Sequence, residues 1–324
     1  MGDRGLLDLI ISRLPAVGHK DRLCLCKAFD AEADFARLSK GDVEALLGRR
    51  LKFFWDIDAI RRTAEADFKS CRARSIGWVS FMDGGYPPLL REIYDPPAVL
   101  FFRGRLAGQE LALFGMVGTR RPSPQAASQA YSLARGLGEL GISVVSGLAL
   151  GVDALAHRGN VDGGAATYAV LGCGVDEVYP ASNRHLAKRV LDSGGAILSE
   201  YPPGTLPHKW HFPARNRIIS ALSSGLFIAE APARSGALIT ADFALDQGKD
   251  VFVSSAGVCI EKNSPYDRRG TVRLAQEGAR IVYSLQGLLD FLPRGFERNG
   301  GVEAAKGAFS FAGGESFISN YKEE

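Results

Sequence analysis

The stretch Ile142–Asn160 constrains the fold more strongly than any other part of the sequence, and it reads I-S-V-V-S-G-L-A-L-G-V-D-A-L-A-H-R-G-N. Its β-branched start is typical of a buried strand. Ser146, Gly147 and Gly151 interrupt that strand, and Asp153 suits the start of a helix. A glycine loop at this junction exposes backbone N–H groups at the positive end of the helix dipole. The stretch therefore predicts either an anion-binding loop or an ordinary tight turn.

The same strand-to-loop pattern recurs at two other places. A strand near 111–117 enters G-T-R-R-P-S-P, and a strand near 226–230 enters A-P-A-R-S-G-A-L-I-T-A. In a parallel sheet the carboxyl ends of the strands share one edge, and ligands bind in the crevice above it. We therefore expect these loops to line a single anion-binding surface.

Strand and helix patterns alternate from residue 111 onward, which predicts an α/β fold with a doubly wound, mostly parallel sheet. The expected strands are 111–117, 142–146, 166–171, 196–199, 226–230, 250–254 and 280–283. The expected helices are 123–139, 153–161, 183–193, 215–223, 237–247, 271–277 and 285–291. The expected domains are a helical unit (1–75), a proline-rich connector with a first strand at 98–102 (76–110), the α/β domain (111–292) and a disordered tail (293–324).

Composition excludes some classes of protein and leaves others open. The net charge is only +3, so affinity for nucleic acid must come from local clusters of basic residues. The sequence contains no apolar run of the ~18 residues that span a bilayer and no signal-peptide profile at its start, so we expect a cytoplasmic protein without a membrane partner. The five cysteines lack zinc-site spacing, and we expect reduced thiols.

Neither a metal nor a nucleotide cofactor is expected from the motifs. His157, His208 and His211 have no carboxylate or cysteine nearby at ligand spacing. Gly172-x-Gly174 lacks the third glycine of a dinucleotide fingerprint, and no G-x-x-x-x-G-K-[ST] sequence occurs.

Seven blocks in a fixed order carry a resemblance to a known family. They are Y-P-P-L-L (86–90), V-G-T-R (117–120), S-G-L-A-L-G-V-D-A-L-A-H-R (146–158), V-L-G-C-G-V-D-E-V-Y-P (170–180), S-E-Y-P-P-G-T (199–205), F-P-A-R-N-R-I-I-S (212–220) and E-A-P-A-R-S-G-A-L-I-T-A (230–241). The ordered set resembles the DNA-processing protein A (DprA/Smf) family. The resemblance implies an extended Rossmann-like core, binding of single-stranded DNA, and loading of a RecA-type recombinase in natural transformation or recombination. It also implies a small N-terminal helical domain of SAM or helix-hairpin-helix type and a homodimer.

The resemblance also implies which residues contact DNA. Lys209 and Phe212 stand where relatives place a phosphate-contacting lysine and a base-contacting aromatic residue, and Arg120 stands at another DNA-contacting position. The full expected set is Gly118, Arg120, Ser146, Gly147, Gly151, Lys209, Phe212, Arg215, Asn216, Arg217, Ser235 and Gly236. No residue is expected to be catalytic.

Several positions leave alternatives open. Trp210 is either a further stacking residue or a buried anchor of its loop. Arg215 and Arg217 lie roughly 200° apart on a helix, so one can face DNA while the other pairs internally, for instance with Glu200 or Glu230. Arg121 and Arg234 are further candidates at the rim.

The sequence departs from the family pattern in three regions. Leu150 occupies a position that is commonly basic in relatives, and Ser254–Ala256 and Val272 differ from the usual residues near the surface where relatives dimerise. The stretch L-P-A-V-G-H-K (14–20) resembles a helix-hairpin-helix turn with Ala16 in place of its first glycine, so it is either a phosphate-binding turn or a plain helical hairpin. Many relatives carry a winged-helix domain after the core, and residues 293–324 are too few to form one.

An enzymatic alternative is a phosphoribohydrolase of the lysine-decarboxylase-like group, which has a related fold. Such enzymes carry a P-G-G-x-G-T-x-x-E block with a reactive glutamate. The comparable turn here reads A-R-S-G-A-L-I-T-A-D, without the doubled glycine and without the glutamate. The sequence therefore favours a non-enzymatic DNA-binding protein.

Overall fold

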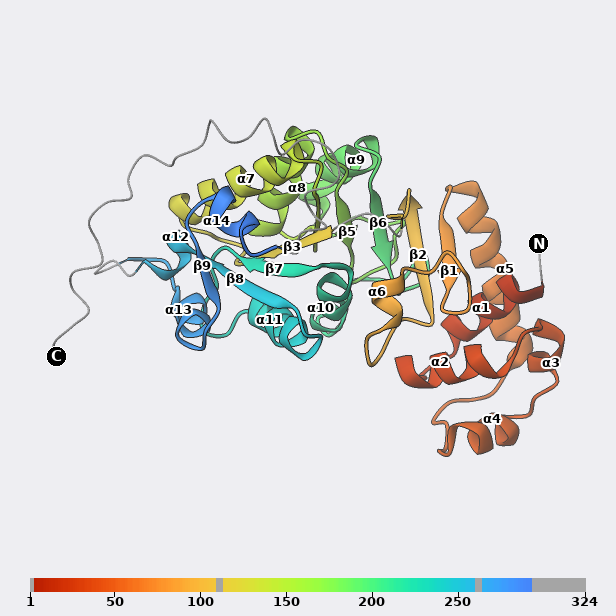
Figure 1. Cartoon of the computed structure of the whole chain (residues 1–324). Coiled ribbons are helices and arrows are strands. Elements are labelled where there is room, and N and C mark those ends of the chain that lie inside the picture. The colour runs from red at the N-terminus through yellow and green to blue at the C-terminus, as the bar shows by residue number, and fades with distance from the viewer. Residues whose placement is uncertain (1–2, 109–112, 260–263, 293–324) are drawn as a thin grey trace.

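The computed structural model describes residues 3–108, 113–259 and 264–292, and within them a nine-stranded sheet runs through the molecule (Figure 1). The strands are β1 (Gly77–Ser80), β2 (Val99–Gly104), β3 (Leu113–Val117), β4 (Ser143–Ser146), β5 (Tyr168–Val170), β6 (Ala196–Ser199), β7 (Gly225–Ile228), β8 (Asp250–Ser254) and β9 (Arg280–Val282). Their order is β1-β2-β6-β5-β4-β3-β7-β8-β9. The strands from β3 to β9 pair in parallel, whereas β1 and β2 add an antiparallel edge beside β6. The predicted doubly wound, mostly parallel sheet is confirmed.

Helices cover both faces of the sheet. One face carries α7 (Pro124–Glu139), α8 (Val152–Asp162), α9 (Arg184–Asp192), α12 (Ser255–Val258) and α14 (Leu285–Leu289). The other face carries α6 (Pro88–Arg91), α10 (His211–Leu222), α11 (Gly236–Asp246) and α13 (Arg269–Gln276).

Alternation along the strands explains the two layers of helices. In β3, Phe114 and Met116 pack with α7 and α8, whereas Leu113 and Val117 pack with α10 and α11. Successive side chains of a strand point to opposite faces, so a strand that is apolar at every position is buried on both sides. The continuous apolar runs in the sequence therefore fix this architecture.

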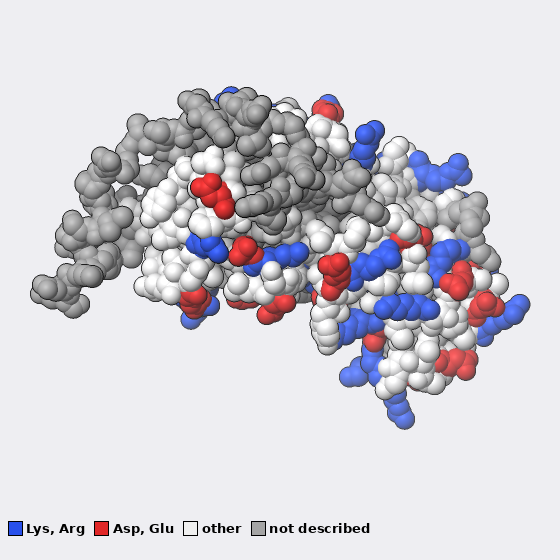
Figure 2. Space-filling model, viewed as in Figure 1, with Lys and Arg blue, Asp and Glu red and all other residues white. Residues whose placement is uncertain are grey.

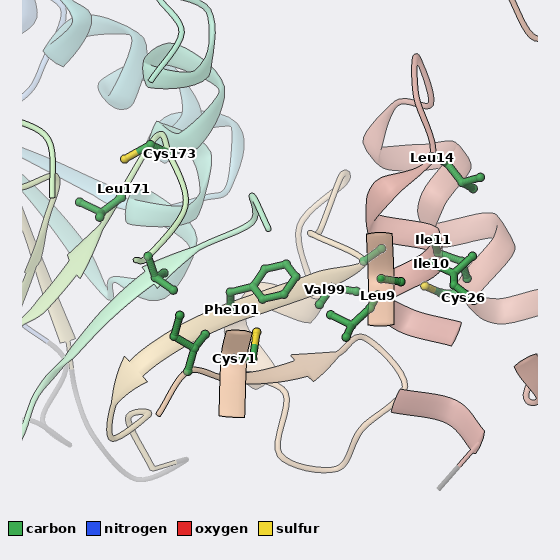
Figure 3. Close-up of a cluster of buried hydrophobic side chains, with 14 of the residues drawn as sticks. Leu9, Ile10, Ile11, Leu14, Cys26, Cys71, Val99, Phe101, Leu171 and Cys173 are labelled. Atoms are coloured by element: carbon green, nitrogen blue, oxygen red, sulfur yellow. The ribbon is translucent and has the colours of Figure 1, made fainter. Parts of the chain in front are cut away.

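The N-terminal helices pack against the edge of the sheet. They are α1 (Asp3–Arg13), α2 (His19–Ala28), α3 (Glu32–Ala36), α4 (Lys40–Leu47) and α5 (Ile57–Ala73). Figure 3 shows side chains of α1 beside Val99 and Phe101 of β2, with Leu171 and Cys173 of the loop after β5 in the same apolar cluster. The helices and the sheet edge thus share one core.

Several elements differ from the sequence-based expectations, among them the short helices α6 and α12, which were not expected. The connector contributes the additional strand β1, whose four residues are too short to show a strand period. Helix α10 begins at His211 and not at 215, so Phe212 lies in its first turn.

The remaining expectations concern the domain limits and the end of the chain. The domain limits stay a prediction, and the expected tail at 293–324 lies outside the described residues, as do residues 111 and 112 of the expected first parallel strand. No helix in the described ranges is long and apolar enough to cross a membrane.

Candidate nucleic-acid interface

The carboxyl ends of β3 and β7 lie side by side in the middle of the sheet, and the order of the chain reverses between them. From β3 the chain continues through β4, β5 and β6 on one side, and from β7 through β8 and β9 on the other. Such a reversal leaves a crevice outside the strand ends, which is where open α/β sheets bind their ligands. The expected anion-binding loops all begin at this edge.

A cleft of about 650 Å³ opens at this crevice. Eight of the twelve expected residues line it: Gly118, Arg120, Lys209, Phe212, Arg215, Asn216, Ser235 and Gly236. They come from the loops after β3 and β7 and from the start of α10. The structure thus brings together residues that are more than a hundred positions apart in the sequence.

Three exposed cations line this cleft, in addition to the buried Arg215. Arg120, Lys209 and Arg234 are exposed, and all three line its walls. None of them forms an ion pair within the described parts of the chain. Their charges are therefore available to an anionic ligand, and a guanidinium group suits the geometry of a phosphate.

Flat side chains lie beside these cations. The Arg120 guanidinium is 6.0 Å from the ring centroid of Phe212, and the Tyr179 ring is 5.4 Å from Phe212 with a tilt of 37°. Tyr179 lines the same cleft. Sequence reasoning gave no role to Tyr179, although an aromatic residue in a loop that follows a strand was a usable signal.

The amino end of α11 forms the wall of the cleft on the β7 side. Ser235 caps this helix, and its hydroxyl accepts a hydrogen bond from the N–H of Ala237 at 3.2 Å. The Asn216 side chain donates to the Gly236 carbonyl at 3.1 Å and ties α10 to this turn. The partial positive charge of a helix amino end thus adds to the three cations.

The glycine loops support the cleft by close packing. A Cβ at Gly147 would lie 2.6 Å from the Arg215 and Asp153 side chains, and a Cβ at Gly118 would lie 2.6 Å from Val152. Gly151 has a φ of 75°, and a Cβ there would lie 2.4 Å from the backbone oxygen of Thr119.

Ser146 is fully buried, and its hydroxyl donates to the Met116 carbonyl. Gly147 borders a small side cavity next to the cleft. Ser146 and Gly151 do not line the cleft, and the structure gives both a packing role; their contact with DNA stays a prediction.

Arg215 lies beneath the cleft and holds its loops. It donates to the carbonyls of Gly147, at 2.9 Å, and of Val170. Burial lowers the pKa of Arg215, and the nearby Asp153 carboxylate opposes this effect. Burial likewise raises the pKa of Asp153, and the Arg215 charge opposes that shift. The two groups stabilise each other's charged form in a dry site.

Arg217 requires a correction, because it does not reach the cleft. Its side chain is 2% exposed and donates to both carboxylate oxygens of Glu200, at 2.8 and 2.7 Å. A third contact joins it to Asp95 at 3.1 Å. Although burial alone would raise the pKa of Glu200, Arg217 and His19 hold it below its usual value. Arg217 is therefore the internally paired member of the two arginines.

The helical-hairpin turn keeps the backbone expected of a glycine. Ala16 has a φ of 52°, in the left-handed region that favours glycine, and Gly18 precedes α2 without a side-chain cap. The turn between α1 and α2 therefore has the expected bend despite the alanine. Phosphate binding at this turn stays a prediction.

Comparison with known proteins places this geometry in a family. The family model for DNA recombination-mediator protein A matches residues 77–293. The DNA processing protein DprA of Streptococcus pneumoniae is 41% identical over 210 residues, which cover 65% of this chain and 72% of that protein. Protein Smf of Borreliella burgdorferi is 30% identical over 284 residues, which cover 88% of this chain and 87% of that protein.

Two solved structures agree with these matches. The crystal structure of DNA processing protein A from Streptococcus pneumoniae superimposes with a TM-score of 0.71 at 33% identity and covers 90% of this chain and 99% of that one. The Helicobacter pylori protein, whose structure addresses its single-stranded DNA binding mode, has a TM-score of 0.57 at 30% identity and covers 66% and 94% of the two chains. The chain therefore belongs to the DNA recombination-mediator protein A family, the family of the DprA and Smf proteins.

Proposed function

We propose that this protein binds single-stranded DNA in the cleft at the carboxyl edge of the sheet. The observation that carries the proposal is the convergence of Arg120, Lys209 and Phe212 on that cleft. An unpaired strand presents phosphates to cations and backbone amides, and its bases present flat faces to aromatic rings. The cleft offers both kinds of group side by side.

The distribution of charge favours a local site over a uniformly basic surface. Figure 2 shows Lys and Arg side chains interspersed with Asp and Glu on the face drawn, and denser over the helical N-terminal end. With a net charge of only +3, the protein lacks the large excess of positive charge that would bind a polyanion over its whole surface. Binding through phosphates and stacked bases predicts weak sequence preference and strong dependence on salt.

Titration of labelled single-stranded and duplex oligonucleotides across a salt series tests the proposal. Arg120→Ala and Lys209→Ala should weaken binding at every sequence and flatten the salt slope by about 0.7 to 1 charge each. Phe212→Ala should cost about 1–3 kcal/mol with little change in slope, because it removes stacking and no charge. Arg135→Ala, which removes an exposed arginine paired with Glu139 on α7, is the matched control.

If Arg120→Ala and Lys209→Ala both bind single-stranded DNA with wild-type affinity, the cleft is not the DNA-binding site. The enzymatic alternative is a phosphoribohydrolase, which would release free base from a nucleoside monophosphate. The same protein preparation can be assayed for release of free base. The cleft disfavours that chemistry, because Asp153 is the one carboxylate among its described lining residues, and it is buried against Arg215.

We further propose that the bound strand is handed to a RecA-type recombinase in the cytoplasm, and that the protein acts as a homodimer. The family membership supports both parts of this proposal. Light scattering gives the mass in solution. Formation of recombinase filaments on a strand already covered by single-strand-binding protein measures the handover, and no gain over recombinase alone would exclude it.

A further inference from the structure

Trp210 is exposed, and it lies outside the set of residues that line the cleft. Its side chain is 68% exposed, although tryptophan is usually well buried. Lys209, which precedes it in the sequence, and Phe212, two positions after it, both line the cleft. The alternative in which a buried Trp210 anchors its loop is therefore not the one that the structure adopts.

A stack of rings holds Trp210 in place. The His208 ring lies parallel to the indole at 4.7 Å, with an angle of 6° between the planes. His208 meets His211 edge to face at 5.0 Å, and His211 stacks on the buried Tyr201 at 3.8 Å. A ring nitrogen of His211 also hydrogen-bonds to the Gly172 carbonyl at 3.0 Å. The indole is thus braced from the interior of the protein, so little side-chain freedom is lost when a ligand covers it.

The position of this stack along the sheet edge relates it to the cleft. Gly172 follows β5, whereas the capped amino end of α11 follows β7, and β4 and β3 lie between these strands. Three interstrand steps of about 4.8 Å separate the two ends, roughly 14 Å in all. A polynucleotide that enters at α11 and passes Phe212 along this edge arrives next at Trp210.

We propose that Leu206, His208 and Trp210, here called the aromatic ledge, form a second platform on which a base of the bound strand stacks after it leaves the cleft. Leu206, two positions before His208 in the same loop, is 61% exposed and adds apolar surface to this loop. Lys209, between the two rings in sequence, supplies the cation for the adjoining phosphate. Stacking on an exposed ring tolerates any base, because every base has a π face. This inference rests on the proposed binding of single-stranded DNA and extends its footprint.

Intrinsic fluorescence tests the ledge directly. The chain has three tryptophans, and the other two, Trp55 and Trp78, are partly buried beside phenylalanine rings. An oligothymidylate of about twenty nucleotides should quench the emission of the wild-type protein and of Trp78→Phe, but not that of Trp210→Phe. A sugar–phosphate chain of equal length without bases should leave the emission unchanged even at saturation.

Affinity measured in parallel by anisotropy separates stacking from other roles of the ring. Trp210→Leu should weaken oligothymidylate binding by about tenfold with an unchanged salt slope, and Trp210→Phe should recover most of that loss because it keeps a flat ring. Saturable binding without quenching, or Trp210→Leu with wild-type affinity, overturns the ledge and leaves the cleft intact. Equal losses in Trp210→Leu and Trp210→Phe also overturn it. If Trp210→Leu binds DNA with wild-type affinity but captures less recombinase, the aromatic ledge contacts a protein partner, and its proposed role in stacking a base is overturned. If the wild-type protein binds no oligonucleotide, the proposed function itself fails.

Discussion

Arg215 and Arg217 lie two positions apart in α10 and bind different parts of the molecule. Arg215 donates to the Gly147 and Val170 carbonyls under the cleft, whereas Arg217 donates to both carboxylate oxygens of Glu200. The rotation between the two positions sends one guanidinium to the site and the other to the structural core. Changes at Arg217 should therefore act on folding and leave the salt dependence of DNA binding unaltered.

Arg217→Ala should lower the free energy of unfolding by about 3–5 kcal/mol, because it leaves the Glu200 carboxylate buried without its main partner. Urea unfolding measures the loss, and a salt series on the folded variant should keep the wild-type slope. Changing Glu200→Gln in an Arg217→Met background should recover part of the stability, since neither residue is then charged. If Arg217→Ala lowers the free energy of unfolding no more than Arg135→Ala does, the buried Arg217–Glu200 pair stabilises the fold no more than an exposed ion pair.

Leu150→Arg should strengthen binding of single-stranded DNA. Leu150 is 45% exposed and borders the small side cavity together with Arg120 and Phe212. A cation at this place adds a phosphate contact, so the salt slope should steepen by about 0.7 to 1 charge and the affinity should rise most at low salt. Leu245→Arg is the matched control, because Leu245 is also exposed, at 56%, and lies on α11 without lining the cleft. The same gain in both variants would indicate a general charge effect.

Much of the cleft could be predicted because it depends on local patterns and one topological rule. Three strand ends carry small residues and two of them also carry arginine, which, combined with the shared edge of a parallel sheet, places Arg120 and Ser235 together without coordinates. The helical period could separate Arg215 from Arg217, but it could not tell which of them faced the ligand. That choice depends on where Glu200 lies, which is a contact across the fold.

Other features depend on partners that are remote in sequence. Strand β2 pairs with β6 in the antiparallel sense through residues about a hundred positions apart, such as Phe101 and Ser199, and β1 then pairs with β2. The exposure of Trp210 likewise follows from the ring stack on Tyr201, and not from any property of its own loop sequence. Such features require the folded chain.

Gly151→Ala should destabilise the protein and weaken DNA binding together. The residue has a φ of 75°, and a Cβ would approach the backbone of Thr119 and Arg120 to 2.4 and 2.6 Å. The loop that presents the Arg120 side chain must then move. Gly164→Ala is the control, because Gly164 has a φ of 90° and nothing lies within 4 Å of its Cβ position. The alanine there introduces backbone strain without a steric clash. Equal DNA affinities in the two variants would argue against a link between Gly151 and the cleft.

Asp8 should make the folded protein more stable as the pH falls from neutral toward about 4. Its side chain in α1 is 2% exposed, and burial raises its pKa from 3.8 to about 6, with Arg4 opposing the shift and Asp83 adding to it. Between the unfolded and folded pKa values the folded state binds the extra proton, so stability decreases as the pH rises through this window. The difference amounts to about 3 kcal/mol for two pKa units.

Asp8→Asn should remove this pH dependence, and urea unfolding of both proteins at several pH values between about 4 and 7 measures the change. Asn keeps an oxygen for the Arg4 side chain and has no proton to gain. Asp34→Asn, at an exposed aspartate of the neighbouring helix α3, should retain the wild-type dependence. Parallel stability curves for the wild type and Asp8→Asn would mean that Asp8 has the same pKa in the folded and unfolded chains. The packing of α1 against the sheet edge would then leave the Asp8 carboxylate accessible to solvent.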